Sequence, residues 1–168
     1  GRVHVIAYLE RLPTAQVCRD PVMRNGPHVE RFMTAAVASV GLIREYAYLA
    51  AAAVVAASNE VLLDQLGIIA PGMSQTVQLP YVYDDILQRR TDMASKMSVS
   101  VAIEGDSENR VTNLLREALT DERFPIVDGE AVLSVTGSIS VESIPSNADF
   151  KSVRWVLNLD MTGPDGRS

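Results

Sequence analysis

The sequence has little of several residue types that mark specialised classes of protein. Cys18 is the one cysteine among 168 residues, which excludes an internal disulfide framework. Aromatic residues make up 5%, and 15 Lys and Arg stand against 21 Asp and Glu, giving a formal net charge of -6. The basic residues form no stripe interleaved with aromatics, so nucleic-acid binding is disfavoured. The acidic balance also disfavours docking on anionic lipid, which attracts polybasic segments.

The chain also lacks a long uninterrupted apolar run. The most apolar stretch, Tyr46 to Ala57, is shorter than the roughly 20 residues that cross a bilayer, and Arg44 and Glu45 stand just before it. We interpret it as a buried helix. Because the sequence begins with Gly1 instead of Met, we expect a piece of a longer protein, from which a signal peptide or lipid anchor could have been removed. Attachment to a membrane would then come only through that anchor.

What is present is a clear alternation of apolar and polar residues near the carboxyl end. The runs 133–142 and 152–161 alternate with period two, and a turn-like segment, 145–149, separates them. This pattern predicts a β-hairpin with one dry face. The residues expected on that face are Leu133, Val135, Ile139, Val141, Val153, Trp155, Leu157, Leu159 and Met161.

The segment before the hairpin predicts a strand, a helix and a short strand. Residues 97–104 alternate like the hairpin, and 124–127 are expected to return as a short strand. The helix between them should be capped by Asp106 or Ser107, whose side chains accept hydrogen bonds from free amides. Its inner stripe is expected to be Val111, Leu114, Leu115, Ala118 and Leu119.

The amino-terminal half predicts mainly helix. Residues 3–9 favour a strand, and we expect Pro13, Pro21 and Asn25-Gly26-Pro27 to break the chain into a loop, with Pro27 in the first turn of a helix. Small residues at 50–53 would allow close approach of another backbone, and Gly67 with Pro71 gives a stop signal. The stripe of this long helix comprises Val29, Phe32, Met33, Ala36, Val37, Val40 and Ile43.

Two questions about that half stay open at the level of sequence. Residues 28–66 could form one helix or two, with the second starting near Ser58-Asn59. A loop over 68–80 and a helix over 84–96 are expected to follow. We therefore predict an α+β fold, in which helices pack on a mixed or antiparallel sheet and a long Ala-rich helix occupies the amino-terminal half. The domains are expected at 1–80 and 81–168, which could also form one continuous domain.

Few side chains suggest chemistry. His4, Cys18, Asp20 and His28 do not match the paired spacing of a structural zinc site, and Cys18 is better explained as a small buried residue than as a nucleophile. Asp84, Asp85 and Asp92 fit a solvated helix whose first acids favour the dipole. We predict no catalytic, cofactor or metal site. An uncharged strand face can accept a partner, and the candidate partner-binding residues are Ser134, Thr136, Ser138 and Ser140.

The carboxyl-terminal part resembles a group of bacterial envelope accessory proteins. The segments that carry the likeness are 109–119, 124–127, 135–139 and 157–163, within 97–166. Similar elements occur in the amino-terminal domain of TolB, the middle domain of FlgT, CsgG and the penicillin-binding-protein activator lipoproteins. The resemblance implies a periplasmic or outer-membrane-associated, often lipid-anchored protein that binds other envelope proteins and carries no catalytic residues.

Two functions from different classes follow. The first is a non-catalytic accessory or assembly protein of the cell envelope that acts through protein-protein interaction. The second is a small-molecule-binding regulatory α+β domain, cytoplasmic or periplasmic, that forms a homodimer through its helices. An enzyme with a pocket that the sequence does not reveal comes third.

Overall fold

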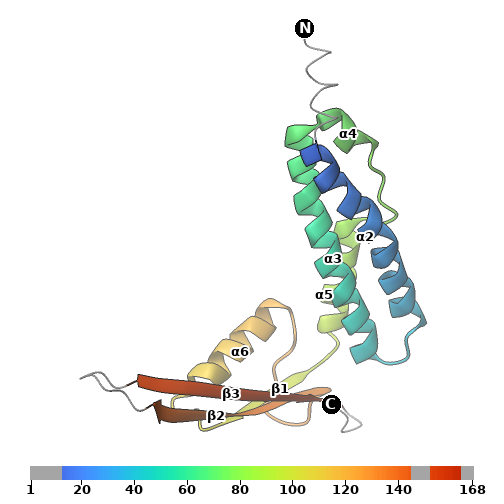
Figure 1. Ribbon diagram of the computed structural model, residues 1–168. Helices are drawn as coiled ribbons and strands as arrows, with labels where there is room; N and C mark the ends of the chain where they lie inside the picture. Colours follow the sequence, from blue (N-terminus) through green and yellow to red (C-terminus); the bar gives the residue numbers. More distant parts are fainter. Residues whose placement is uncertain (1–12, 145–151, 164–168) are drawn as a thin grey trace. The chain divides into compact units, whose positions relative to one another are not determined.

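The structure is a computed structural model that describes residues 13–144 and 152–163 (Figure 1). Its fold is α+β, as predicted. The chain divides into two units after Met93. The expected boundary at residue 80 differs from this division, because the helix that follows residue 80 packs in the first unit. The strand predicted over 3–9 lies outside the described residues, as does the predicted turn over 145–149.

The described part of the first unit, from residue 13 on, consists of helices and their connections. The helices are α2 (Pro13–Ala38), α3 (Leu42–Ile69), α4 (Pro71–Thr76) and α5 (Tyr83–Ala94), whose last residue already belongs to the second unit. Helices α2 and α3 lie along each other (Figure 1). The chain turns between them at Gly41, whose φ of 102° lies in the left-handed region that favours glycine. Residues 28–66 thus belong to two helices, and the break between them lies at 39–41 and not near Ser58-Asn59, the position considered from the sequence.

The prediction of a loop around Pro21 and Pro27 is also wrong. Both prolines lie inside α2, so Pro27 does not begin a helix. A proline leaves the carbonyl four residues earlier without its helical partner. Those carbonyls belong to Val17 and Met23, which are exposed, so water can reach this side of the helix. The buried residues of α2 lie on its opposite side and recur at helical spacing: Ala15, Cys18, Val22, Gly26, Val29 and Ala36.

The Ala-rich run of α3 supplies part of the core. Ala52, Ala53 and Ala56 are buried together with Val29 of α2 and Ile86 of α5. The predicted close approach at 50–53 is thus confirmed for this face of the helix. The continuous α3 is longer than the apolar run 46–57, and by length and composition it is apolar enough to cross a membrane, with 28% of its most apolar window buried. A core helix of a soluble protein meets the same criterion.

The segment between α3 and α5 is more ordered than predicted. In place of a loop over 68–80, the structure has the short helix α4, which begins at Pro71. Proline suits a first helical position because the amide there has no helical partner. Gly67 lies in the last turn of α3, which ends at Ile69, so the stop signal is confirmed to within one turn.

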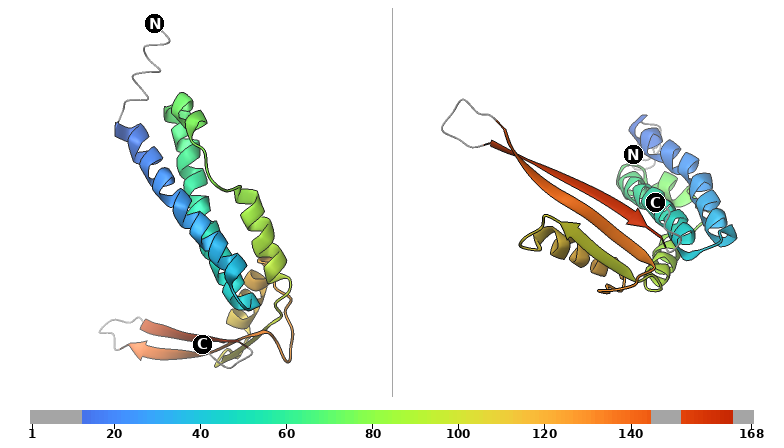
Figure 2. Two further views of the ribbon diagram at one scale, coloured as in Figure 1. Left: turned by 90° about the vertical axis from the view of Figure 1, so that its right-hand side faces the viewer. Right: turned by 90° about the horizontal axis from the view of Figure 1, so that it is seen from below.

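In the second unit, the residues that the structure describes form a three-stranded sheet with one helix. Its elements are β1 (Val99–Glu104), α6 (Arg110–Asp121), β2 (Leu133–Ile144) and β3 (Ser152–Thr162). The strand order is β1-β2-β3, with β1 parallel and β3 antiparallel to β2. This confirms the predicted strand, helix and hairpin. The hairpin extends beyond the end of β1 (Figure 2).

Two local predictions in this unit need correction. Residues 124–127 make only a single bridge, Val99 with Ile126, because just the amides of Val99 and Val127 join the two segments. The N-cap position of α6 is taken by Asn109, with a φ of 54°. Asp106 lies before the helix but still stabilises its first turn, since its carboxylate accepts a hydrogen bond from the backbone amide of Thr112.

Candidate protein-docking surface

One face of the sheet in the second unit is apolar across all three strands. Residues directly opposite each other in paired strands share a face, and the register aligns Val101 with Val135 and Val135 with Met161. We call this surface the apolar face. Its described members are Val99, Val101, Ile103, Leu133, Val135, Gly137, Ile139, Val141, Leu157, Leu159 and Met161.

Helix α6 packs mainly against β1 and leaves the far side of the apolar face open. Val135 is 5% exposed, whereas Leu159 is 45% and Met161 52% exposed. Leu157 and Val141 are exposed to a similar degree. The face that was predicted to be buried is therefore buried only in the part next to β1. The side chain of Trp155, which we expected in the core, lies outside the described residues.

The inner stripe of α6 is narrower than predicted. Leu115 and Leu119 are half-buried, but Leu114 is 64% exposed and Ala118 is exposed. One helix over the edge of a sheet offers too little surface to bury all five predicted positions. Two of them, Leu114 and Ala118, remain at the surface.

A groove lies between α6 and the open part of the apolar face. Its volume is about 410 Å³. Leu115, Ala118 and Leu119 line it from the helix, and Val135, Leu159, Asp160 and Met161 line it from the sheet, with Glu122 just after the end of α6. The apolar residues of this lining were all predicted to be core, so the groove was not predicted. The signal available in the sequence was that only one predicted helix, between the first strand and the hairpin, could cover three strands.

Gly137 permits the close packing of the sheet beside this groove. A Cβ at this position would lie 2.3 Å from the backbone oxygen of Asn158 and 2.8 Å from Cδ2 of Leu159. The side chains of Ile103 and Leu159 thus close over a residue that has none. A larger residue would push these two side chains apart.

The opposite face of the sheet is polar and carries the four predicted partner-binding residues. Ser134 and Ser138 are half-buried, while Thr136 and Ser140 are exposed. The hydroxyl of Ser100 donates to that of Ser134 at 3.2 Å. β2 is the central strand. From Ser134 to Ser138 its backbone pairs with β1 on one side and with β3 on the other, so a partner strand cannot add along this part. Contact through the side chains stays a prediction.

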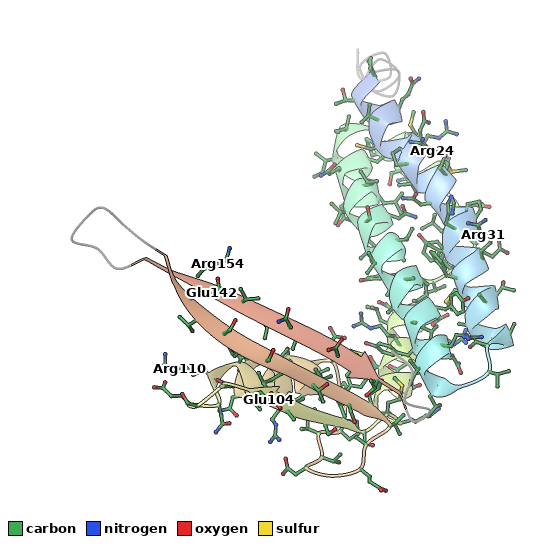
Figure 3. All side chains as sticks on the ribbon, turned by 60° about the horizontal axis from the view of Figure 1, so that its bottom comes forward. Arg24, Arg31, Glu104, Arg110, Glu142 and Arg154 are labelled. Carbon is green, nitrogen blue, oxygen red and sulfur yellow. The ribbon has the colours of Figure 1, made fainter. Side chains whose placement is uncertain are left out.

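At the outer end of the hairpin, one ion pair joins the two strands on the polar face. Arg154 lies directly opposite Glu142, and its guanidinium donates to the Glu142 carboxylate (Figure 3). The Nε atom lies 3.1 Å from Oε2. Both side chains are more than half exposed, so the pair fixes local geometry more than it stabilises the fold.

The described side chains that were weighed as metal ligands or nucleophiles do not form a cluster. Cys18 is buried in α2, as predicted, with its Sγ 3.8 Å from Oε1 of Gln65. Asp20 is exposed, and exposed His28 accepts a hydrogen bond from Arg31, while His4 lies outside the described residues. Within the described ranges, no three His, Cys, Asp or Glu side chains come together.

The acids of α5 lie as predicted for a solvated helix. Asp84 and Asp85 occupy the first turn, and Asp92 accepts a hydrogen bond from Gln88 at 2.8 Å. The positions of Asp84 and Asp85 match the positive end of the helix dipole, whereas Asp92 lies in the last turn.

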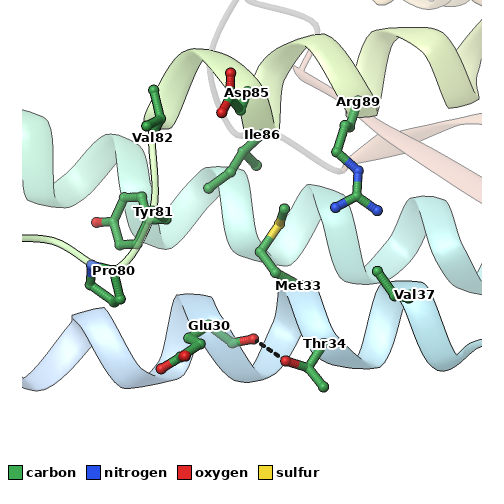
Figure 4. Close-up of a pocket in the computed structure, with 10 residues that line it drawn as sticks. All are labelled: Glu30, Met33, Thr34, Val37, Pro80, Tyr81, Val82, Asp85, Ile86 and Arg89. Atoms are coloured by element: carbon green, nitrogen blue, oxygen red, sulfur yellow. Dashed lines mark hydrogen bonds between the residues drawn. The ribbon is translucent and has the colours of Figure 1, made fainter.

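A second hollow, of about 360 Å³, lies in the helical unit (Figure 4). Met33 and Ile86 supply apolar surface, while Glu30, Asp85 and Arg89 supply charge around it. Its remaining lining includes Thr34, Val37, Pro80, Tyr81 and Val82.

Tyr81 connects this hollow to a buried amide. Asn59 is the one fully buried polar residue among those described, and its Nδ2 donates to the Tyr81 hydroxyl at 2.7 Å. Its Oδ1 accepts from Nδ2 of Asn25 at 2.9 Å. Burial raises the pKa of Tyr81, and the hydrogen bond from Asn59 partly opposes this shift. From the sequence, Asn59 was considered only as one possible start of a second helix, and this network was not predicted.

Comparison with family models, with curated proteins and with solved structures gives no match for this chain.

Proposed function

We propose that the chain is a non-catalytic protein-protein interaction module that binds a partner protein through the groove beside α6. The half-exposed apolar face carries this proposal. Isolated apolar side chains on a surface are ordinary, but a continuous row beside a groove is typical of interaction sites.

The chemistry of the surface favours a polypeptide as the partner. The groove is lined by aliphatic side chains and by Met161, a flexible residue that adapts to varied partners. The two ionisable residues in its lining, Glu122 and Asp160, are both acidic, and the chain as a whole is acidic. Nucleic acid and anionic lipid are therefore poor ligands for this surface, whereas an apolar segment of another protein suits it.

The cell envelope is the proposed setting. This part of the proposal rests on the resemblance of residues 97–166 to envelope accessory proteins, whose partners are other envelope proteins. We accordingly propose a periplasmic or outer-membrane-associated location. Fractionation of cells that carry the native chain tests the location independently of binding.

Site-specific photo-crosslinking tests the docking surface. A photoreactive amino acid at Ala118, which is exposed and lines the groove, should form an adduct with a second, different protein in cells that carry the native chain. The matched control is the neighbouring residue Glu117, which is exposed on α6 but does not line the groove. Equal adducts from both positions, or none from Ala118, would contradict the proposal.

A small-molecule-binding function is the second candidate, and the hollow of the helical unit favours it. Apolar residues with acids and Arg89 at the rim suit an amphiphilic metabolite. Such a ligand should raise the melting temperature of the chain, because it binds only the folded state.

A pair of tryptophan variants tests this second function. Val37→Trp should fill the mouth of the hollow and abolish the thermal shift. Val54→Trp is the control, since both valines are 70% exposed but Val54 does not line the hollow. If a screen of amphiphilic metabolites gives no shift with the native chain, or if both variants respond alike, the hollow is not a binding site.

A further inference from the structure

The outer edge of β3 is open in the described part of the chain. Strand β3 pairs with β2 on one side, and no described strand pairs with its other side. The outer edge of β1, by contrast, is partly covered, since Val99 bonds to Pro125 and Val127. An open edge on a strand of 11 residues without proline or glycine is a template for another strand.

The sequence of β3 matches itself when it is reversed. In an antiparallel pair, opposite residues share a face. If a second copy of β3 pairs with the first about Leu157, the midpoint of Ser152–Thr162, the strands overlap over their full length. Leu157 then lies opposite itself, and Arg154 lies opposite Asp160 of the second copy. The twofold symmetry makes this ion pair twice.

Neighbouring registers lose this match. A shift of two residues places Arg154 opposite Asn158 or Thr162, which carry no charge. A shift of one residue places apolar positions opposite polar ones, which would carry the apolar face of one copy onto the polar face of the other. Only the register about Leu157 combines opposite charges with full overlap.

The same pairing would complete the exposed side of the sheet. Leu157 and Leu159 are about half exposed at this edge, where a neighbouring strand is missing. In the register about Leu157, the apolar face continues from one copy into the other. Arg154, already opposite Glu142, would lie between two carboxylates on the polar face.

We propose that two copies of this chain associate through antiparallel pairing of their β3 strands about Leu157, forming one continuous six-stranded sheet. This proposal goes beyond the docking function and does not depend on it. A monomeric chain could still give the Ala118 adduct with a different protein. A dimer could form without that adduct.

Charge reversal tests the register in the full chain by sedimentation equilibrium. The native chain should be dimeric, and Asp160→Arg should raise the dissociation constant about tenfold or more, because both ion pairs become repulsive. The triple variant E142R/R154D/D160R restores opposite charges both between the copies and between β2 and β3 of each copy, and should return to within about threefold of the native value. Glu104→Arg, the same charge change on the same face of β1, is the control and should have no such effect.

Cysteine crosslinking gives a second readout in a Cys18→Ala background. Leu157→Cys should form a disulfide between two copies, because the residue faces itself across the twofold axis. Val141→Cys, on the same face and similarly exposed at 51%, should not. A native chain that stays monomeric, an Asp160→Arg variant that behaves like Glu104→Arg, or equal crosslinking of both cysteines would overturn the proposal.

Discussion

The carboxylate of Asp106 accepts hydrogen bonds from both the amide and the hydroxyl of Thr112, each at 2.8 Å. It thus ties the loop after β1 to the first turn of α6, whose own N-cap residue provides no side-chain bond. These bonds hold the pKa of Asp106 below its ordinary value of 3.8, with the Thr112 amide as the main cause. The helix that borders the docking groove therefore depends on a carboxylate that precedes it.

Asp106→Asn should lower the urea midpoint of unfolding at neutral pH, because the amide is a weaker acceptor than the carboxylate. A lowered native pKa stabilises the fold above the ordinary value, and this contribution is lost as the pH falls through the native pKa. The difference between native chain and variant should therefore shrink in acid. A difference independent of pH between 7 and 3 would contradict this role.

Gly137→Ala should destabilise the second unit by about 2 kcal/mol or more, because the new Cβ meets a backbone oxygen that cannot move freely. Gly129→Ala is the matched control, since a Cβ there meets nothing within 4 Å. Chemical denaturation of both variants measures the difference. Equal stability of the two would show that the sheet can open at Gly137 without cost.

Asn59→Ala should cost about 2 kcal/mol of unfolding free energy, since it removes the bonds that Asn59 makes with both the Asn25 amide and the Tyr81 hydroxyl. Ser58→Ala changes an exposed neighbour in the same helix and should have little effect. The pKa of Tyr81, followed by ultraviolet absorbance, should rise further in Asn59→Ala, because the bond from Asn59 lowers it in the native chain. An unchanged titration would exclude this contact.

Pro27→Ala should stabilise the helical unit by about 1–2 kcal/mol, because the regained helical bond outweighs the added freedom of the unfolded chain. Pro71→Ala, at the first position of α4, lacks this gain and should be neutral or mildly destabilising. Thermal unfolding compares the two. A loss of stability in Pro27→Ala would contradict this prediction and would mean that the proline ring stabilises α2.

The sequence predicted the second unit better than the first for a physical reason. Period-two alternation in 133–142 and 152–161 fixes which side chains share a face, so the hairpin could be predicted. It does not fix how far one helix covers that face, so the exposure of Leu159 and Met161 was missed. In α2, local break signals at Pro21 and Pro27 were overridden by the stripe through Cys18, Val22 and Val29, whose burial against α3 outweighs two lost bonds.

The buried amide of Asn59 could not have been predicted from its neighbours along the chain. Asparagine in or beside a helix is more often an end cap or a surface residue. The partners of Asn59, which are Asn25 and Tyr81, also lie far away in sequence. Only the packing of α2 on α3 brings the three side chains together. The partner-binding assignment of Ser134, Thr136, Ser138 and Ser140 likewise could not foresee that β2 is the central strand.

The most direct test of the docking surface is the yield of the Ala118 adduct in a Met161→Lys background. Met161 is 52% exposed in the groove, so lysine should leave the melting temperature nearly unchanged but place a charge where the apolar partner binds. Met23→Lys, a similarly exposed position on α2, is the control. We expect the adduct to disappear only in Met161→Lys; an unchanged yield in that variant would contradict the proposed role of the apolar face.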